Sequence, residues 1–467
     1  MVPVWLILIP LLTGLVSFGL QNAKAVKAWA LFSTIIATTL IIAGIYFLNP
    51  SSLQFNATWL KLLGSNFSFK LDGMSKMLCL LTAVSFLIIF IAINKNEYKN
   101  SKSFYALMLL MQAGFMGVFT ATDALLFYFF WELALIPAYF LCSMWGGEKR
   151  IQVTFKFFVY TFAGSLIMLC GIIYLYFQTP NQTFSLESFY NLHLSNKQQY
   201  ILFWLFFIAF AIKMPMFPFH TWQPDTYQQS STGVTMALSG VMAKMGIFAV
   251  IRWVVPVFPE AVSHFSNIVI ILSIIGIVYA SLIAIRQDDI KRLIAYSSIA
   301  HISLMCAAIF SQNNTAMQGV LIQMFNHGIV VIGLWIVADA VEQQVGTRKL
   351  SELGGLAQKA PALAIFIVVL AFANVALPLA SSFIGEFLML SGLFQYNIIM
   401  AAIAGTTIIL SSIYTLNMVQ KIFYGNTVAL TEKAVDISSN IKTALIILVI
   451  IIIVLGVYPQ PMLNLVK

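Results

Sequence analysis

Charged residues are scarce in this 467-residue chain: only 9% of its residues are Asp, Glu, Lys or Arg, whereas 60% are hydrophobic. This composition excludes a water-soluble domain. Cysteine is also rare, and Cys79, Cys142, Cys170 and Cys306 all lie in apolar stretches without C-x-x-C spacing. We interpret them as packing residues and not as ligands of a metal or cluster.

The sequence lacks the motifs of nucleotide and redox chemistry as well. It has no G-x-G-x-x-G fingerprint, no Walker loop and no paired-cysteine ligand set. We therefore expect no cofactor and no metal in this chain. Any redox or nucleotide chemistry that it serves is expected in another chain.

Long apolar runs, in contrast, recur from end to end. A run of about 18 or more apolar residues crosses the hydrocarbon of a bilayer as a helix. The sequence thus predicts an all-α polytopic membrane protein with about 14 transmembrane helices, the first of which stays as an anchor because no basic segment precedes it. The predicted spans are residues 3–20, 28–48, 72–93, 104–121, 123–143, 155–178, 200–218, 232–254, 265–285, 292–310, 316–340, 362–394, 398–424 and 440–459.

Basic residues predict the orientation of these spans, because lysine and arginine gather in cytoplasmic loops. Most of the 25 basic residues fall in loops after odd-numbered spans, so both termini are expected on the outer side. The net charge of +9 is spread over many short loops, which favours membrane topology over a nucleic-acid partner. The basic residues in these loops are Lys24, Lys27, Lys95, Lys99, Lys102, Lys149, Arg150, Lys156, Arg286, Lys291, Arg292, Arg348, Lys349, Lys359, Lys421, Lys433 and Lys442.

Four charged residues lie deep within apolar runs: Glu132, Lys213, Lys244 and Glu386. A charge near the bilayer midplane costs about 2.5–3.5 kcal/mol on insertion scales, so it is normally paired or hydrated inside a helix bundle. Alternating acids and bases at this depth indicate a proton path. A static salt bridge between Glu132 and Lys213 is the structural alternative.

Two histidines, His301 and His327, are flanked by apolar residues in spans of their own. Imidazole accepts a hydrogen bond on one nitrogen while it donates from the other, which suits a proton relay at neutral pH. A core histidine bonded to a carbonyl is the alternative, but the buried lysines and glutamates favour the relay. His220 is expected at a channel mouth or in packing, and His193 and His264 in loops.

Prolines predict breaks in two spans. Pro215 and Pro218 follow Lys213 in span 7, and Pro378 precedes Glu386 in span 12; proline removes a backbone hydrogen bond and clashes with the preceding turn. Broken helices at corresponding positions of two halves are typical of inverted-repeat transporters.

We therefore expect two inverted five-helix repeats, although the residue identity between the halves is weak. The predicted divisions are residues 1–103 (helices 1–3), 104–254 (first repeat, helices 4–8), 265–424 (second repeat, helices 9–13) and 440–467 (helix 14).

Six motifs carry a resemblance that spans most of the chain. They are LDGMS at 71–75, FWELALIPAYFL at 130–141, AIKMPMFPFHTWQPDTY at 211–227, SGVMAKMGIFAVIR at 239–252, DDIKRLIAYSSIAHIS at 288–303 and SSFIGEFLML at 381–390. In this order they resemble the antiporter-like membrane subunits of respiratory complex I, the proton-pumping NADH:quinone oxidoreductase, which are related to Mrp antiporters.

The resemblance implies roles for individual residues. Glu132 matches the glutamate of the fifth span, Lys213 the lysine of the broken seventh, and Lys244 the central lysine of the eighth. Related subunits usually have lysine where this chain has Glu386, and glutamate resembles the middle subunit of the three, the NuoM type. At residues 376–379 the chain has Ala-Leu-Pro-Leu where the family often has Gly-Leu-Pro-Gly.

The resemblance also implies a function: proton translocation through Glu132, Lys213, Lys244, His301, His327 and Glu386, driven by quinone reduction elsewhere in the complex. NADH, FMN, iron–sulfur clusters and quinone are then expected in partner subunits. The expected partners are the other membrane-arm subunits, including two antiporter-like ones, in a bacterial inner membrane with both termini periplasmic. The alternatives are a subunit of a multi-subunit sodium/proton antiporter, a subunit of a membrane-bound hydrogenase, and a structural membrane scaffold.

Overall fold

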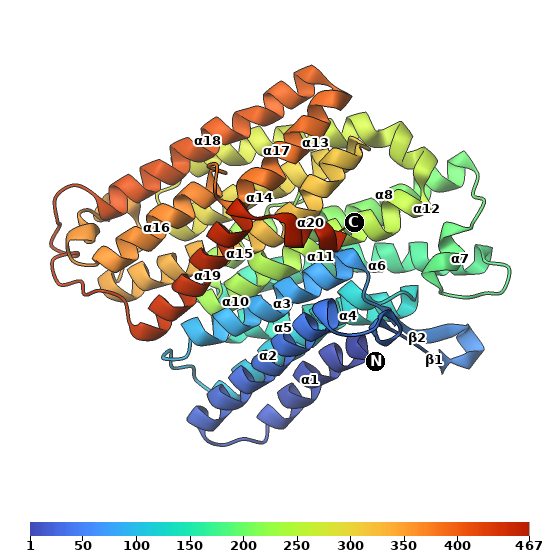
Figure 1. Cartoon of the computed structure of the whole chain (residues 1–467), viewed down its shortest axis with the longest axis horizontal. Helices are drawn as coiled ribbons and strands as arrows, with labels where there is room; N and C mark the ends of the chain where they lie inside the picture. Colours follow the sequence, from blue (N-terminus) through green and yellow to red (C-terminus); the bar gives the residue numbers. More distant parts are fainter. Residues whose placement is uncertain (467) are drawn as a thin grey trace.

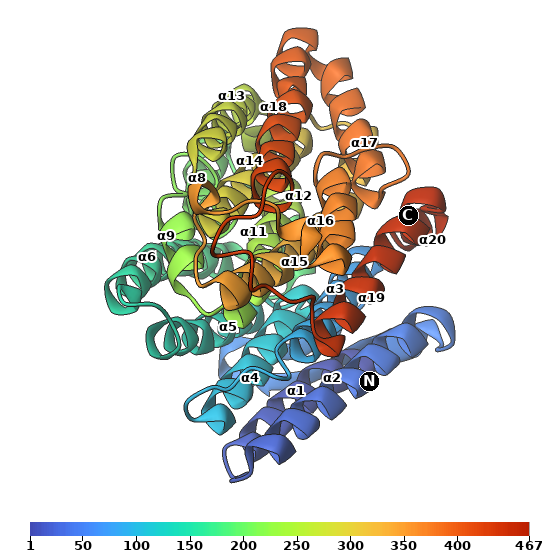
Figure 2. The same ribbon diagram turned by 90° about the vertical axis from the view of Figure 1, so that its left-hand side faces the viewer.

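Long apolar helices form almost the whole molecule, which a computed structural model describes for residues 1–466 (Figures 1 and 2). In this part of the chain, 11 helices are long and apolar enough to cross a membrane, and Val2–Ser17 and Pro361–Asn374 are shorter apolar helices. A polytopic helical membrane protein is thus confirmed. The count of 14 spans and the inverted repeats stay predictions, and the predicted end of the last domain at residue 467 lies outside the described residues.

The elements follow one another along the chain with short connections. They are α1 (Val2–Ser17), α2 (Ala23–Tyr46), η1 (Pro50–Leu53), β1 (Gln54–Leu60), η2 (Lys61–Leu63), β2 (Ser65–Lys70), α3 (Gly73–Ala92), α4 (Ser101–Thr120), α5 (Ala124–Met144), α6 (Arg150–Gln178), α7 (Leu186–Tyr190), α8 (Asn196–Lys213), α9 (Trp222–Gln229), α10 (Thr232–Ala237), η3 (Leu238–Met242), α11 (Ala243–Ala249), η4 (Val250–Val254), α12 (Val255–Val257), α13 (Pro259–Arg286), α14 (Ile290–Phe310), α15 (Asn314–Val345), η5 (Leu350–Glu352), η6 (Leu356–Gln358), α16 (Pro361–Asn374), α17 (Ser381–Tyr396), α18 (Ile398–Phe423), α19 (Ser439–Val457) and α20 (Gln460–Val466).

An antiparallel hairpin departs from the predicted all-α fold. Strands β1 and β2 pair with Phe55 opposite Phe69, and Gly64 between them has a positive φ of 60°. Asn66 to Lys70 alternates polar and apolar residues, which is the period of a strand with one covered face. The alternation is too short to stand out among the apolar helices, so the predicted spans 28–48 and 72–93 have no strand between them.

Two connections interrupt the helices near the predicted breaks. Helix α8 ends at Lys213 and α9 begins at Trp222, while α16 ends at Asn374 and α17 begins at Ser381. In the second connection, Ala376 and Leu379 adopt positive φ values of 55° and 75°. Left-handed backbone costs a non-glycine residue about 1–2 kcal/mol, so packing around this connection must hold it in place.

The interior of the bundle is formed by α14, α15 and the central helix, by which we mean the continuous segment Thr232–Val257 (α10, η3, α11, η4 and α12). The apolar windows of α14 and α15 are entirely buried, and 94% of that of the central helix is, whereas α19 is only 22% buried. Exposed apolar side chains on the outer helices, such as Phe155 and Ile409, suit contact with lipid.

The start of α1 and helix α20 lie toward the same end of the bundle as the hairpin and α7 (Figure 1). We call this end the terminal face, and the opposite end the basic face, because its loops carry most of the lysines and arginines. The terminal amine of Met1 donates to the Ser52 carbonyl at 2.7 Å. The division of basic residues between the two faces agrees with the predicted topology, while the side of the membrane that each face contacts stays a prediction.

Candidate functional site

Lys244 lies in the centre of the central helix, one residue into α11. Its side chain is fully buried, and its Nζ donates to the Ser239 carbonyl at 2.7 Å and lies 2.8 Å from His327 Nδ1. Ser239 belongs to the π-helical turn η3. Such turns are rare in proteins and are frequently found at functional sites.

His327 on α15 connects this lysine to the second half of the chain. Its Nε2 lies 3.3 Å from the Ser298 hydroxyl on α14, and its ring centroid is 5.6 Å from that of His301. His301 Nδ1 in turn lies 3.0 Å from Glu386 Oε1 on α17, within ion-pair distance but without hydrogen-bond geometry. The structure therefore brings Lys244, His327, His301 and Glu386 together in one buried line, which we call the relay line.

Glycines explain how Glu386 comes so close to α15. A Cβ on Gly385 would lie 2.5 Å from Gln323 Oε1, and one on Gly319 would lie 2.8 Å from the Gly385 carbonyl. Helices α15 and α17 can approach this closely only because neither position has a side chain. Glu386, the residue after Gly385, is thereby held beside α15 and buried.

Gln323 is a member of the site that the sequence analysis missed. Its Nε2 donates to Glu386 Oε1 at 3.3 Å. It precedes His327 by one helical turn, so both side chains lie on the same face of α15. A search for polar residues one turn from each buried histidine would have found it, and also Ser297 and Ser298, one turn before His301.

A further group of buried polar residues surrounds the middle of the relay line. The Ser297 hydroxyl donates to Tyr414 Oη at 3.0 Å, and the Asn374 amide donates to Ser297 Oγ at 3.3 Å and to Thr415 Oγ1 at 2.9 Å. These contacts join α14 to α16 and α18 at the point where α16 ends. Buried polar groups normally find such partners, because an unmade hydrogen bond is costly.

Glu132 and Lys213 form no hydrogen bond with the relay line or with each other in the described part of the chain. Among the ion pairs of residues 1–466, none joins these two side chains. Glu132 Oε1 and Lys213 Nζ are both buried without a hydrogen-bond partner from the described protein, and Nζ lies 5.2 Å from the Trp131 ring centroid. The static salt bridge is therefore not formed in this structure.

Lys213 is nevertheless close in space to the segment that carries Lys244. A Cβ on Gly246 would lie 2.7 Å from both the Met214 amide nitrogen and the Phe210 carbonyl. The end of α8 thus packs directly on α11, through Met214, which follows Lys213, and Gly246, two residues after Lys244. Lys213 therefore shares no hydrogen bond with the relay line, although the backbone next to it contacts the helix that carries Lys244.

The remaining histidines divide into three cases. His220 is buried and packs between Phe217 and Tyr279, with centroid distances of 5.8 Å and 5.2 Å. His193 lies in a loop, as predicted. The prediction of a loop for His264 is wrong: α13 begins at Pro259, earlier than expected, and the ring stacks on Tyr200 at 4.5 Å.

The fold and the site together define a polytopic membrane protein with titratable groups in its core. Residues 121–411 match the model of the family described as "NADH:quinone oxidoreductase/Mrp antiporter, TM". The match covers more than half of the chain, which therefore belongs to this family. The resemblance inferred from the motifs is confirmed.

Individual relatives agree with this assignment. The NADH-quinone oxidoreductase subunit M of Rickettsia prowazekii is 38% identical over 412 residues, covering 86% of this chain and 83% of the relative. A chain of respiratory complex I from Thermus thermophilus with bound NADH superposes with a TM-score of 0.92 at 29% identity, covering 100% of this chain and 98% of that one. A chain of the Mrp complex from Dietzia sp. gives 0.90 at 20% identity over 100% and 95%, which shows the common fold.

Proposed function

We propose that this chain is the M-type subunit of a bacterial NADH:quinone oxidoreductase and moves protons across the inner membrane. The observation that supports this most directly is the buried relay line from Lys244 to Glu386. Buried ionisable side chains in membrane proteins mark ion and proton pathways. The relatives are named NADH-quinone oxidoreductase subunit M, which supports membership of such a complex, and we propose that the quinone chemistry takes place in its other subunits.

In this proposal each member of the relay line takes up a proton on one side and releases it on the other. Lys244 Nζ would pass its proton to His327 Nδ1, 2.8 Å away, and His301 Nδ1 would pass its proton to Glu386 Oε1, 3.0 Å away, once the ring turns into hydrogen-bond geometry. The two rings, 5.6 Å apart between centroids, need one short step between them, through water or a ring movement. Glu386 would release the proton toward the outer side.

Glu132 and Lys213 are proposed as the switch that drives the line. A buried ammonium is costly without a counter-charge, so an approach of Glu132 favours protonated Lys213 and separation favours release of its proton. NADH, FMN, iron–sulfur clusters and quinone would be held by partner subunits, which supply the driving reaction. The two inverted repeats, residues 104–254 and 265–424, are proposed as the units that carry the two half-paths, with periplasmic termini.

Replacement of Lys213 by alanine tests this function. We expect an assembled complex in which proton pumping and coupled quinone reduction fall by about tenfold or more, because the switch loses its titratable base. Lys197→Ala is the matched control, since Lys197 is exposed at the other end of α8. Pumping would be followed in proteoliposomes with a pH-sensitive dye at equal complex content.

Wild-type pumping by assembled Lys213→Ala complex would refute the switch. Sodium uptake that continues without electron transfer would instead assign the chain to a sodium/proton antiporter, the runner-up function. The same vesicles answer both questions, because proton and sodium movements are measured with and without NADH and quinone.

A further inference from the structure

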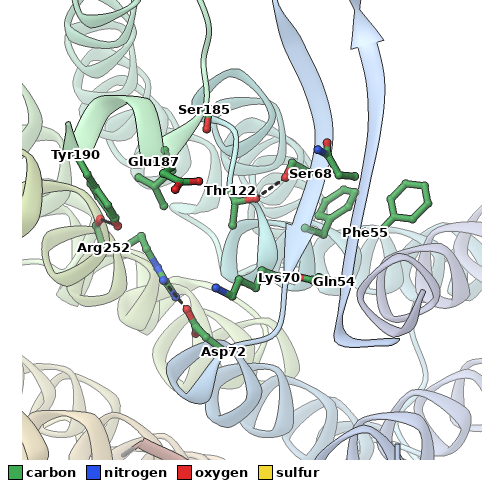
Figure 3. A pocket seen from close by; sticks show the side chains of 13 residues that line it. Gln54, Phe55, Ser68, Lys70, Asp72, Thr122, Ser185, Glu187, Tyr190 and Arg252 are labelled. Carbon is green, nitrogen blue, oxygen red and sulfur yellow. Dashed lines mark hydrogen bonds and ion pairs between the residues drawn. The ribbon is translucent and has the colours of Figure 1, made fainter. Parts of the chain in front are cut away.

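A polar pocket opens on the terminal face, away from the relay line. It has a volume of about 700 Å³ and lies between the hairpin, the start of α3, α7 and the end of the central helix (Figure 3). Lys70, Asp72, Glu187 and Tyr190 contribute polar side chains, and Arg252 forms its inner wall. Nothing in the proposed proton path uses these residues.

Arg252 is held in place by several partners at once. Its Nη1 forms an ion pair with Asp72 Oδ2 at 2.5 Å, and the two side chains point toward each other in Figure 3. Its Nη2 donates to Ser75 Oγ at 3.2 Å, and its carbonyl accepts from Tyr190 Oη at 2.7 Å. Asp72 is fixed in turn, because it caps α3 by accepting from the Ser75 amide at 3.0 Å.

The ion pair persists at neutral pH. Burial alone would raise the pKa of Asp72, but the hydrogen bond and positive charge of Arg252 outweigh it and hold that pKa below its usual range. A carboxylate with a lowered pKa keeps its stabilising contact above its ordinary value and loses it only as the pH falls through the lowered one. Ordinary assay conditions therefore leave the contact closed.

Phe248 stands between this ion pair and Lys244. Lys244, Phe248 and Arg252 follow one another at four-residue spacing, which places them along one side of the central helix. The guanidinium carbon of Arg252 lies 5.2 Å from the Phe248 ring centroid, within cation–π range. Phe248 is 1% exposed and meets Phe119 of α4 edge-on at 5.3 Å, one turn of the central helix from Lys244 on one side and from Arg252 on the other.

We propose that Arg252 is a positioning residue that holds Phe248 against Phe119 and so seals Lys244 from protons in the terminal-face pocket. This inference rests on the proposed function, because only a chain that moves protons needs its central lysine isolated from one side. Water and hydrated ions do not cross a closed apolar constriction readily. Asp72 acts by fixing Arg252, and the π-helical turn η4, which contains Arg252, interrupts the regular helix at this point.

The test is the passive proton leak of the intact complex in proteoliposomes, measured without NADH or quinone. A pH gradient is imposed, potassium and valinomycin balance the charge, and an enclosed pH-sensitive dye reports its decay. We expect Arg252→Gln and Asp72→Asn each to speed the decay by about tenfold, the change produced by lowering a barrier by about 1.4 kcal/mol.

Lys70→Gln is the matched control, because Lys70 lies in the same pocket but forms no ion pair among the described residues. Assembled Arg252→Gln and Asp72→Asn complexes that leak no faster than wild type overturn the inference. An equal leak from Lys70→Gln also overturns it, since the pocket would then be damaged unspecifically. If Arg252→Gln does not assemble, Phe248→Ala tests the same seal with the ion pair present, and a wild-type leak there overturns it as well.

The proposed seal and the proposed pumping function are tested by different measurements. Loss of pumping in Lys213→Ala is read during turnover, whereas the leak is read in the resting complex. A normal leak in the ion-pair variants together with lost pumping in Lys213→Ala would remove the seal and leave the pump.

Discussion

Replacing Glu386 by glutamine removes one charge from the relay line and little else. Glutamine has almost the shape of glutamate, and its amide oxygen can still accept from Gln323 Nε2, which lies 3.3 Å from Glu386 Oε1. It cannot take up and release a proton, and it gives His301 Nδ1, 3.0 Å away, no anion to donate to. Helices α15 and α17 should stay packed, because Gly319 and Gly385 make their contact.

The size of the effect follows from this loss of titration. A side chain that transfers a proton directly accelerates a reaction by about 10²–10⁴-fold. Since Glu386 ends the connected line, we expect proton pumping and coupled quinone reduction to fall by about 100-fold. The amount of assembled complex should remain near wild type.

The assay compares quinone reduction and membrane-potential formation in vesicles at matched complex content. Glu386→Lys is the informative companion, because lysine restores a titratable group of opposite charge type. We expect it to keep part of the activity. Equal pumping by Glu386→Gln and wild type would make Glu386 structural and move the terminal step elsewhere, with His327 the next candidate.

Two further predictions concern stability. Gly246→Ala should lower the apparent unfolding temperature of the purified complex, because the new Cβ would lie 2.7 Å from backbone atoms of α8 and overpacking costs about 1–3 kcal/mol. Gly405→Ala in α18 is the control: nothing lies within 4 Å of the new Cβ, so the unfolding temperature should not fall. Asp123, the N-cap of α5, accepts hydrogen bonds from Leu125, Leu126, Asn66 and Ser65, so Asp123→Ala should also destabilise the complex, by about 2 kcal/mol or more. Asn22→Ala removes a single exposed cap contact and should cost only about 1 kcal/mol. A Gly246→Ala complex as stable as wild type, or equal losses from the two cap variants, would contradict the packing described above.

The sequence was most informative about single helices. Apolar runs predicted the polytopic fold, and charges within those runs singled out Lys213, Lys244 and Glu386, all of which are buried. These properties depend on local composition and on the cost of placing a charge in hydrocarbon. The prolines after Lys213 also marked the place where α8 ends.

Contacts between distant segments were beyond the reach of the sequence. Lys244 and His327 are 83 residues apart, and their 2.8 Å contact depends on how the central helix packs on α15. Gln323 was missed because an uncharged polar residue in an apolar run has no distinctive signature alone. The hairpin was missed because two short strands bury little apolar surface and depend on contacts such as the hydrogen bond between Ser68 and Thr122.

The two lysines of the site differ in a way that bears on how the chain transmits movement. Lys244 Nζ has two partners within 3 Å and belongs to an unbroken helix, whereas Lys213 Nζ has none from the described protein and ends α8. Between Lys213 and Trp222 the backbone forms no regular helix: the Met214 and Met216 amides still donate to Phe210 and Ala211 of α8, at 2.8 Å and 2.9 Å, but the repeating helical pattern ends there. Met214 in that segment already touches Gly246, two residues from Lys244, with no side chain between them. The contact between Met214 and Gly246 therefore joins the residue after Lys213 to the helix that carries Lys244.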